Sequence, residues 1–351
     1  MSRTLPPRQY GAKRPSRFKA EMEEAQQIQI PDSALYAVPR PVDVAYIRQE
    51  ILGWWSKPDY WQYHYAMLGR RPIKGAQSWM MDAEGTRWWT EDTFRRAELF
   101  WVSPEMSEVI ATLYPSIPEC EPQPPCETGF VVFGKAVPGT DAMNGGPIYT
   151  TAFVWGDVQT LLGDCYSIET YCHRDALYAY ALIPEGKERE RFTKEAMPLK
   201  LHPTGGSEWP KGTMWSDFSV LGQETADREA SMMEDRKLLS CFWALLGQKI
   251  TLEERWQPDR RTARQFARGA KNGPSIPPWV RVVRLREPAP RSQDAGRGEV
   301  EWRYRWLVSE HWRNQYYPST GQHRPKLIHA YQKGPADKPL LLRDTVKALV
   351  R

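Results

Sequence analysis

Residues 129–174 read GFVVFGKAVPGTDAMNGGPIYTTAFVWGDVQTLLGDCYSIETYCHR, and this stretch decides the predicted fold. It holds three short runs rich in Val, Ile, Tyr, Phe and Thr, each bounded by Gly, Pro, Asp or Asn, and a fourth such run follows at 176–184. Side chains of these types pack well on a pleated sheet, whereas the bounding residues are typical of turns. We therefore expect a mostly antiparallel β-rich region over 121–220, with an ordered loop at 198–216.

Toward the N-terminus, apolar residues recur at helical spacing, which predicts a helical region over 41–120. Val44, Ile47 and Ile51 share one face of a helix that runs from 42 to about 55. A second, short helix is expected to start at Asp59, a residue type that caps helix N-termini well.

Two more helices are predicted between residues 90 and 118. Thr90 is the candidate N-cap of the first one. The apolar residues that then lie on its inner face are Phe94, Ala97, Phe100 and Trp101. The second one opens at Ser103 and Pro104, because proline at the first helical position loses no intrahelical hydrogen bond.

The region 221–351 is predicted to hold a long helix, from about 224 to 249, and a small antiparallel sheet made of strands at 277–288, 299–312 and 325–334. Between them, Pro258 opens a short helix with four arginines largely on one side: Arg260, Arg261, Arg264 and Arg268. The predicted class is α+β, with N-terminal helices, a mostly antiparallel β-rich middle, and a helix leading to the sheet. Residues 1–40 are expected to form a basic, disordered arm.

Composition excludes several classes of protein. No run of about 18 apolar residues occurs, and the N-terminus lacks the apolar segment of a secretory signal, so we expect a cytoplasmic protein without a membrane span. The five cysteines are odd in number and do not have zinc-site spacing, so neither a disulfide framework nor a metal is expected. No cofactor is expected. Most of the 16 tryptophans should anchor cores, although some could stack on bases.

Charge is distributed unevenly along the chain. Residues 1–20 hold six Lys/Arg and no acid, and residues 251–351 hold 21 Lys/Arg against 10 Asp/Glu. The remaining residues, 21–250, are net acidic by 12 charges. Basic ends of this kind favour a polyanionic partner, and the alternative is that they fold onto the acidic middle.

A row of basic residues follows the predicted C-terminal strands. If 300–315 is a strand, its alternate residues Arg303, Arg305 and His311 share the face opposite the core. Two arginines from the neighbouring strand would extend this face, and guanidinium groups suit phosphate because each can donate two parallel hydrogen bonds. The predicted nucleic-acid-binding residues are Arg281, Arg284, Arg303, Arg305, Arg313, Gln315, Arg324 and Lys333.

Other side chains nearby fit the same hypothesis. Trp312, Tyr316 and Tyr317 offer rings on which bases could stack, and Lys326 could clamp the same groove together with Arg324 and Lys333. The alternative interpretation is an ordinary solvated sheet face, because arginine often covers exposed strands.

A catalytic interpretation centres on His311. Together with Arg313, Gln315, His323 and Lys333 it supplies the residue types of a metal-free site that cleaves phosphodiesters, namely a base, an acid and a cation. The same histidines are equally a run of surface residues. No phosphate-binding loop, dinucleotide fingerprint or serine-hydrolase elbow is present.

The C-terminal segment resembles the ending of uncharacterised proteins from actinobacteria, their phages and their mobile elements. The resemblance is carried by VRVVRLR at 280–286, WLVSEHWRNQ at 306–315, His323-Arg324 and KGP at 333–335. It covers about the last 75 residues, and the helix around EDRKLLSCFWALLGQ more weakly. It implies a phage or mobile-element context, where nucleic acid is a common partner, and it assigns no activity to any residue.

The sequence therefore favours a nucleic-acid-binding protein of a phage or mobile element, with DNA or RNA as its partner. One alternative is a metal-free nuclease or transferase with His311 at its centre. Another is an interaction module whose acidic middle binds a host protein.

Overall fold

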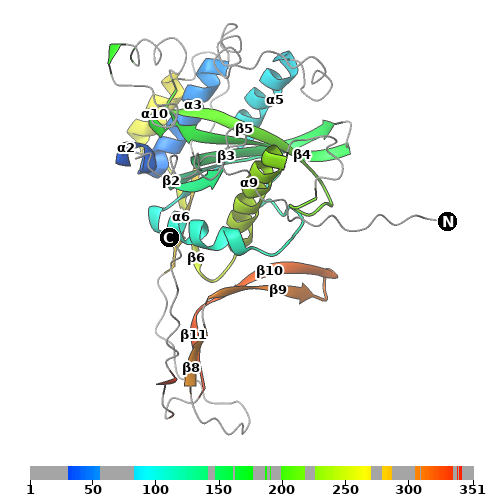
Figure 1. The fold of residues 1–351 in the computed structure, drawn as a ribbon. Helices are drawn as coiled ribbons and strands as arrows, with labels where there is room; N and C mark the ends of the chain where they lie inside the picture. Colours follow the sequence, from blue (N-terminus) through cyan, green and yellow to red (C-terminus); the bar gives the residue numbers. More distant parts are fainter. Residues whose placement is uncertain are drawn as a thin grey trace, which may run out of the picture.

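The computed structural model describes residues 31–55, 83–140, 147–160, 163–176, 186–187, 190, 199–217, 226–269, 279–286, 305–308, 310–334, 338 and 340–341 (Figure 1). The predicted N-terminal arm up to residue 30, the short helix expected at Asp59, most of the run at 176–184 and Arg303 lie outside these residues.

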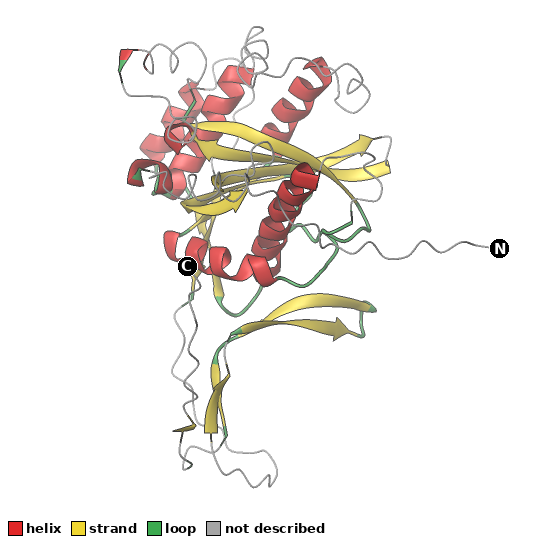
Figure 2. Cartoon of the chain, in the orientation of Figure 1, coloured by secondary structure: helices red, strands yellow, loops and turns green. Residues whose placement is uncertain are grey.

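A seven-stranded mixed sheet forms the centre of the fold, and helices cover both of its faces (Figure 2). Its strand order is β5-β4-β3-β2-β1-β7-β6. The strands are β1 (Glu98–Val102), β2 (Gly129–Thr140), β3 (Pro147–Thr160), β4 (Gly163–His173), β5 (Leu201–Pro210), β6 (Thr251–Trp256) and β7 (Val280–Leu285). The predicted α+β class is confirmed, and β2, β3 and β4 lie where the opening stretch predicts strands.

One helical layer consists of α3 (Pro41–Trp55), α5 (Ala83–Arg96) and α10 (Arg260–Gly269), which pack on the sheet face that carries Trp101 and Phe130. The other layer consists of α6 (Pro104–Leu113) and α9 (Ala226–Leu245), which pack on the face that carries Phe100 and Phe133. Two short elements complete the described helices, α2 (Asp32–Leu35) and the 3-10 turn η2 (Tyr114–Ser116). None of the helices in the described part of the chain has the length and apolarity needed to span a membrane.

The helix start predicted at Ser103 is confirmed. The Ser103 hydroxyl accepts a hydrogen bond from the Met106 backbone N–H at 3.3 Å, and Pro104 is the first residue of α6. The serine thus satisfies one of the N–H groups that the first helical turn leaves unpaired.

The prediction that Phe100 and Trp101 continue a helix is wrong. That helix ends as α5 at Arg96, and both aromatic residues lie on β1, which runs parallel to β2 on one side and to β7 on the other. Phe100 is 0 % exposed and Trp101 is 5 % exposed, on opposite faces. A strand buried on both faces is apolar throughout, so its periodicity does not distinguish it from a helix.

The prediction of a loop over 198–216 is also wrong. Residues Leu201–Pro210 form β5, which pairs antiparallel with β4 and lies at the edge of the sheet. Strand β6, at the opposite edge, was likewise not predicted.

The three predicted C-terminal strands do not form one sheet. β7 belongs to the central sheet, where Val280, Val282 and Val283 are buried, so its apolar residues are covered by both helical layers. The remaining strands are β8 (Arg305–Val308), β9 (His311–Tyr317), β10 (Gln322–Ile328), β11 (Tyr331–Lys333) and β12 (Leu340–Leu341). β9 pairs with β10, and β8 lies between β11 and β12.

The pairs β8–β11 and β9–β10 form a single bent antiparallel ribbon. Val308 lies opposite Tyr331 and His311 lies opposite Ile328, so the register is unchanged across the break between the two pairs. At the break, the imidazole Nδ1 of His329 lies 3.4 Å from a carboxylate oxygen of Glu310. Figure 1 shows the β9–β10 part beside α6 and α9, and the β8–β11 part leading away from them.

Trp312 and Leu327 attach the ribbon to the body of the protein, meaning the central sheet with its two helical layers. Leu327 is 4 % exposed and joins the core between the sheet and α9. The Trp312 indole N–H donates to the Leu113 carbonyl at 3.1 Å, and the Gln248 amide donates to the Pro325 carbonyl at 3.3 Å. The face of the ribbon that carries Trp312 and Leu327 therefore points to the body.

Two partly buried carboxyl groups lie at β4: Glu169 belongs to the strand, and Asp235 belongs to α9. Glu169 accepts hydrogen bonds from the Tyr171 hydroxyl at 2.7 Å and the Thr90 hydroxyl at 3.3 Å, and Asp235 accepts one from Thr170 at 2.8 Å. Burial raises the pKa of each carboxyl group to about 7, because the interior disfavours the charged form.

We expect Glu169→Gln to change how stability depends on pH. Because the folded-state pKa is raised, Glu169 favours folding below pH 4.5, and that contribution is lost as pH rises to about 7. Glu169→Gln should raise the free energy of unfolding at pH 8 by about 1–2 kcal/mol and reduce its slope between pH 4.5 and 7, measured by urea denaturation. Glu50→Gln, at an exposed position of α3, is the control, and equal pH profiles for the parent and Glu169→Gln would contradict the expectation.

We expect Trp312→Ala to release the ribbon without unfolding the sheet. The substitution removes both the ring packing and the hydrogen bond to Leu113, whereas Trp312→Phe removes the hydrogen bond and keeps a ring. Hydrogen exchange of amides in residues 311–328 should accelerate at least tenfold in Trp312→Ala and much less in Trp312→Phe. Unchanged exchange in the alanine variant would show that Trp312 does not anchor the ribbon.

Candidate nucleic-acid interface

The outer face of the ribbon, defined here as the β9–β10 face that points away from Trp312 and Leu327, carries the predicted polar residues. Cross-strand partners in an antiparallel pair point to the same side, and successive residues alternate. Arg313 lies opposite Lys326, and Gln315 lies opposite Arg324. The full set on this face is His311, Arg313, Gln315, Tyr317, Gln322, Arg324, Lys326 and Ile328.

The three cations of the outer face have no carboxylate partner among the residues that the structure describes. Arg313 and Lys326 are exposed, and Arg324 is partly buried. One Arg324 Nη donates to the Gln322 side-chain oxygen at 3.3 Å, and its Nε has no hydrogen-bond partner in the described structure. Arg313 and Lys326 therefore keep exposed N–H donors to which an anion could bind, and Arg324 offers the N–H groups of its guanidinium other than the buried Nε–H.

Aromatic rings lie at the end of the ribbon next to the turn that joins β9 to β10. Tyr317 is 36 % exposed and belongs to the outer face, whereas Tyr316 is 47 % exposed and belongs to the opposite face. The Tyr316 ring lies 5.0 Å from the His323 ring, centroid to centroid. Exposed tyrosines beside unpaired cations can add stacking on bases to the electrostatic attraction of phosphates.

Arg281 does not belong to this face. It lies on β7, where its guanidinium contacts a carboxylate oxygen of Glu98 at 3.1 Å and one of Glu253 at 2.7 Å. It also lies over the Phe100 ring at 4.9 Å. Arg281 thus neutralises two carboxylates of the neighbouring strands β1 and β6.

The other predicted residues are spread over several elements. Arg284 lies on β7, 3.9 Å from a carboxylate oxygen of Glu254. Arg305 lies on β8, and one of its Nη groups donates to the Gln332 side-chain oxygen at 3.4 Å. Lys333 lies on β11, opposite Trp306. The expectation of one shared face is therefore wrong for the residues that the structure describes. Arg281 and Arg284 lie in the central sheet, and Arg305 and Lys333 lie on the β8–β11 part of the bent ribbon; the β9–β10 part brings together Arg313, Gln315 and Arg324.

The geometry does not assemble a pair of catalytic histidines. His311 lies opposite Ile328 at one end of β9, and His323 lies opposite Tyr316 near the other end. The two positions are about 17 Å apart along the strands, and they point to opposite faces. They cannot act as acid and base on the same atom, because proton transfer needs hydrogen-bond reach.

The described residues contain no cluster of three or more His, Cys, Asp or Glu side chains that could hold a metal ion. All five cysteines are free thiols. Burial raises the pKa of Cys120 to about 11 and that of Cys126 to about 12, so neither thiol is activated as a nucleophile at neutral pH.

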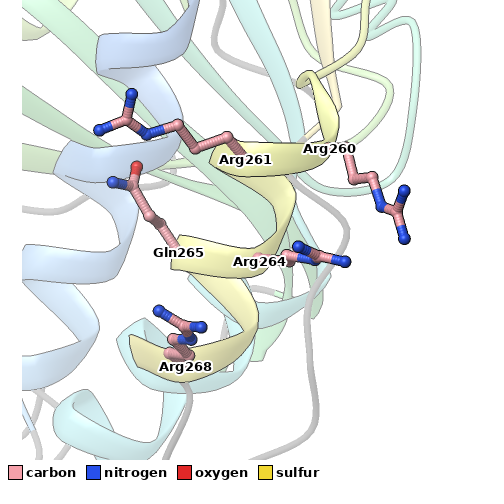
Figure 3. A pocket seen from close by; sticks show the side chains of 5 residues that line it. All are labelled: Arg260, Arg261, Arg264, Gln265 and Arg268. Carbon is pink, nitrogen blue, oxygen red and sulfur yellow. The ribbon is translucent and has the colours of Figure 1, made fainter.

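The arginines of α10 form a second basic surface to which the sequence assigned no role. They are Arg260, Arg261, Arg264 and Arg268, and they line a hollow of about 460 Å³ together with Gln265 (Figure 3). The signal was visible in the sequence as four arginines within nine residues without an acid among them.

Comparison with known proteins adds little to this geometry. No protein-family model matches the chain, and no curated protein matches it in sequence. Among solved structures, the chain is similar to the crystal structure of AcrVA2, with 11% sequence identity and a TM-score of 0.35, over 90% of this chain and 97% of that chain. A TM-score of this size does not establish a shared fold.

Proposed function

We propose that the protein binds nucleic acid through the outer face of the ribbon, where Arg313, Arg324 and Lys326 contact phosphates. One observation carries the proposal: the three cations share a face, and no carboxylate among the described residues neutralises them. Each guanidinium can donate two parallel hydrogen bonds to phosphate oxygens, and the lysine adds a point charge.

The shape of the ribbon supports duplex DNA as the partner. The major groove of B-form DNA admits a two-stranded antiparallel ribbon, whereas the deep, narrow major groove of duplex RNA does not admit side chains. The outer face also carries Gln315, whose amide matches the hydrogen-bonding edge of adenine. Phosphate contacts by the cations would fix the position of the ribbon, and Gln315 and Tyr317 would contact bases.

The resemblance of the C-terminal segments to proteins of phages and mobile elements supports a phage-related or mobile-element context for this binding. Two of those segments, WLVSEHWRNQ and His323-Arg324, contribute Arg313, Gln315 and Arg324 to the outer face. The context is an association and adds nothing to the physical argument, which rests on the unpaired cations.

We expect the triple substitution Arg313→Gln, Arg324→Gln and Lys326→Gln to weaken binding of a 30-base-pair DNA duplex at least tenfold at 100 mM salt. Each lost phosphate contact should lower the slope of log affinity against log salt by about 0.9, so the triple variant should lose about 2 to 3 units. Fluorescence anisotropy over 50–300 mM NaCl measures both quantities. The same titration with an RNA duplex tests the preference for DNA.

Arg96→Gln is the matched control. Arg96 is exposed but forms an ion pair with Asp92 at 3.1 Å, so removing its charge should leave the affinity within twofold. An affinity that does not change with salt in the parent, or a triple variant that binds like the parent, would overturn the proposal.

A further inference from the structure

Helix α10 presents one face to the body and the other to solvent. Phe266 is 8 % exposed and stacks on the Tyr46 ring of α3, with 4.5 Å between centroids. The Tyr46 hydroxyl donates to the Gln265 side-chain oxygen at 3.1 Å. At the N-terminus, a carboxylate oxygen of Asp259 accepts the Thr262 backbone N–H at 2.7 Å, so this acid serves as the helix cap.

The four arginines occupy the solvent face as one cluster. Residues 260, 264, 268 and 261 fall within an arc of about 100° around the helix axis and span about 12 Å along it. All four are exposed, and none forms an ion pair with any residue in the described part of the chain. Together with Gln265 they line one hollow, and in Figure 3 the side chains of Arg261, Gln265 and Arg268 point to the side of α10 where α3 lies, whereas Arg260 and Arg264 point to the other side.

This arrangement opposes the electrostatics of an isolated helix. Arg260 and Arg264, and Arg264 and Arg268, are four residues apart, and like charges at this spacing repel. Arg260 and Arg261 also lie in the first turn, where the helix dipole favours anions. An anion bound along this face would relieve both effects at once.

We propose that this face of α10 is a second surface for the phosphate backbone of nucleic acid. The positions of Arg260, Arg264 and Arg268 follow one another at about 6 Å along the helix axis, so these three side chains can contact different phosphates. The apolar residue Phe266 faces α3 and is not available for insertion into a membrane, which an interfacial helix requires. The face also lacks the buried aromatic or aliphatic anchor that protein interfaces concentrate at their centres, so an acidic protein is a poorer fit.

The two basic surfaces lie on opposite sides of the central sheet. α10 packs on α3 and the core that contains Trp101, whereas the ribbon packs on α6 and the core that contains Phe100. A protein with one phosphate-binding surface on each side can hold two nucleic-acid segments. If both surfaces bind phosphates, the protein can bridge two duplexes. This part of the inference rests on the proposed function of the ribbon.

Direct binding tests the α10 surface separately from the ribbon. In the background of the triple ribbon variant, the 30-base-pair duplex should still bind in a salt-dependent manner, and adding Arg264→Gln and Arg268→Gln should weaken this residual binding at least tenfold. Arg264→Lys with Arg268→Lys is the matched control, which keeps both charges and should keep most of the binding. Loss in the Gln variant together with retention in the Lys variant cannot be attributed to unfolding of α10.

A capture assay tests bridging. Biotinylated duplex on beads should retain a second, fluorescent duplex when the parent protein is present. The variant with Arg264→Gln and Arg268→Gln should reduce retention of the fluorescent duplex at least tenfold. The variant protein itself should still be retained on the beads by the biotinylated duplex. If the ribbon variant binds and bridges like the parent and the α10 variant loses all binding, the proposed ribbon function fails and the α10 surface stands.

The inference is overturned if the α10 Gln variant binds and bridges like the parent. It is overturned as well if the ribbon variant retains no duplex binding. A third contradicting outcome is that the charges of Arg264 and Arg268 are needed for binding to vesicles containing anionic phospholipid but not for binding to duplex DNA.

Discussion

The pairing of β1 with β2 and β7 is the interaction on which the rest of the structure depends. This five-residue strand joins residues near 130 to residues near 280 in one sheet, and it is buried on both faces. Phe100 packs edge to face on Phe242 of α9, whereas the Trp101 indole N–H donates to the Val38 carbonyl at 2.8 Å on the other side. A strand of this kind requires a helical layer on each face. Those two layers are also what carry the ribbon and α10 on opposite sides of the molecule.

The elements that the sequence predicted correctly are those with a strong local signal. Ser103 followed by Pro104 opens α6, and the β-branched and aromatic runs of 129–174 form β2, β3 and β4. β5 was missed because Pro203, Gly205 and Gly206 are turn residues in most contexts. An edge strand tolerates them, because one of its sides has no hydrogen-bonded neighbour and the register shift near Thr170 absorbs the irregularity.

The candidate site was partly predictable for a similar reason. Alternation along a strand gives the side chains that share a face, and this places Arg313 and Gln315 together on the ribbon. Alternation does not predict which other strand pairs with it, because pairing between residues distant in sequence depends on the whole core. Arg281 therefore lies beside Glu98, 183 residues earlier in the chain, instead of beside the ribbon arginines. On α10, four arginines within nine residues form the clearest pattern in the sequence. The structure adds that these arginines are exposed and form no ion pairs among the described residues, and this is what gives the pattern a functional meaning.

The uneven charge of the chain has two explanations: the basic residues pair with acids inside the fold, or they remain available for a polyanionic partner. Different basic residues support different explanations. At β7, the basic C-terminal part does fold onto acids, since Arg281 contacts Glu98 from the acidic middle and Glu253 from its own region. That arginine lies between strands that carry glutamates, and its guanidinium also lies over the Phe100 ring, which favours a fixed partner. By contrast, Arg313, Arg324 and Lys326 of the ribbon and the four arginines of α10 form no ion pair among the described residues, and all of them except the partly buried Arg324 are exposed. Excess positive charge that folding leaves in solvent is the part that remains available to attract a polyanion, because exposed charges keep their long-range field until a partner neutralises it.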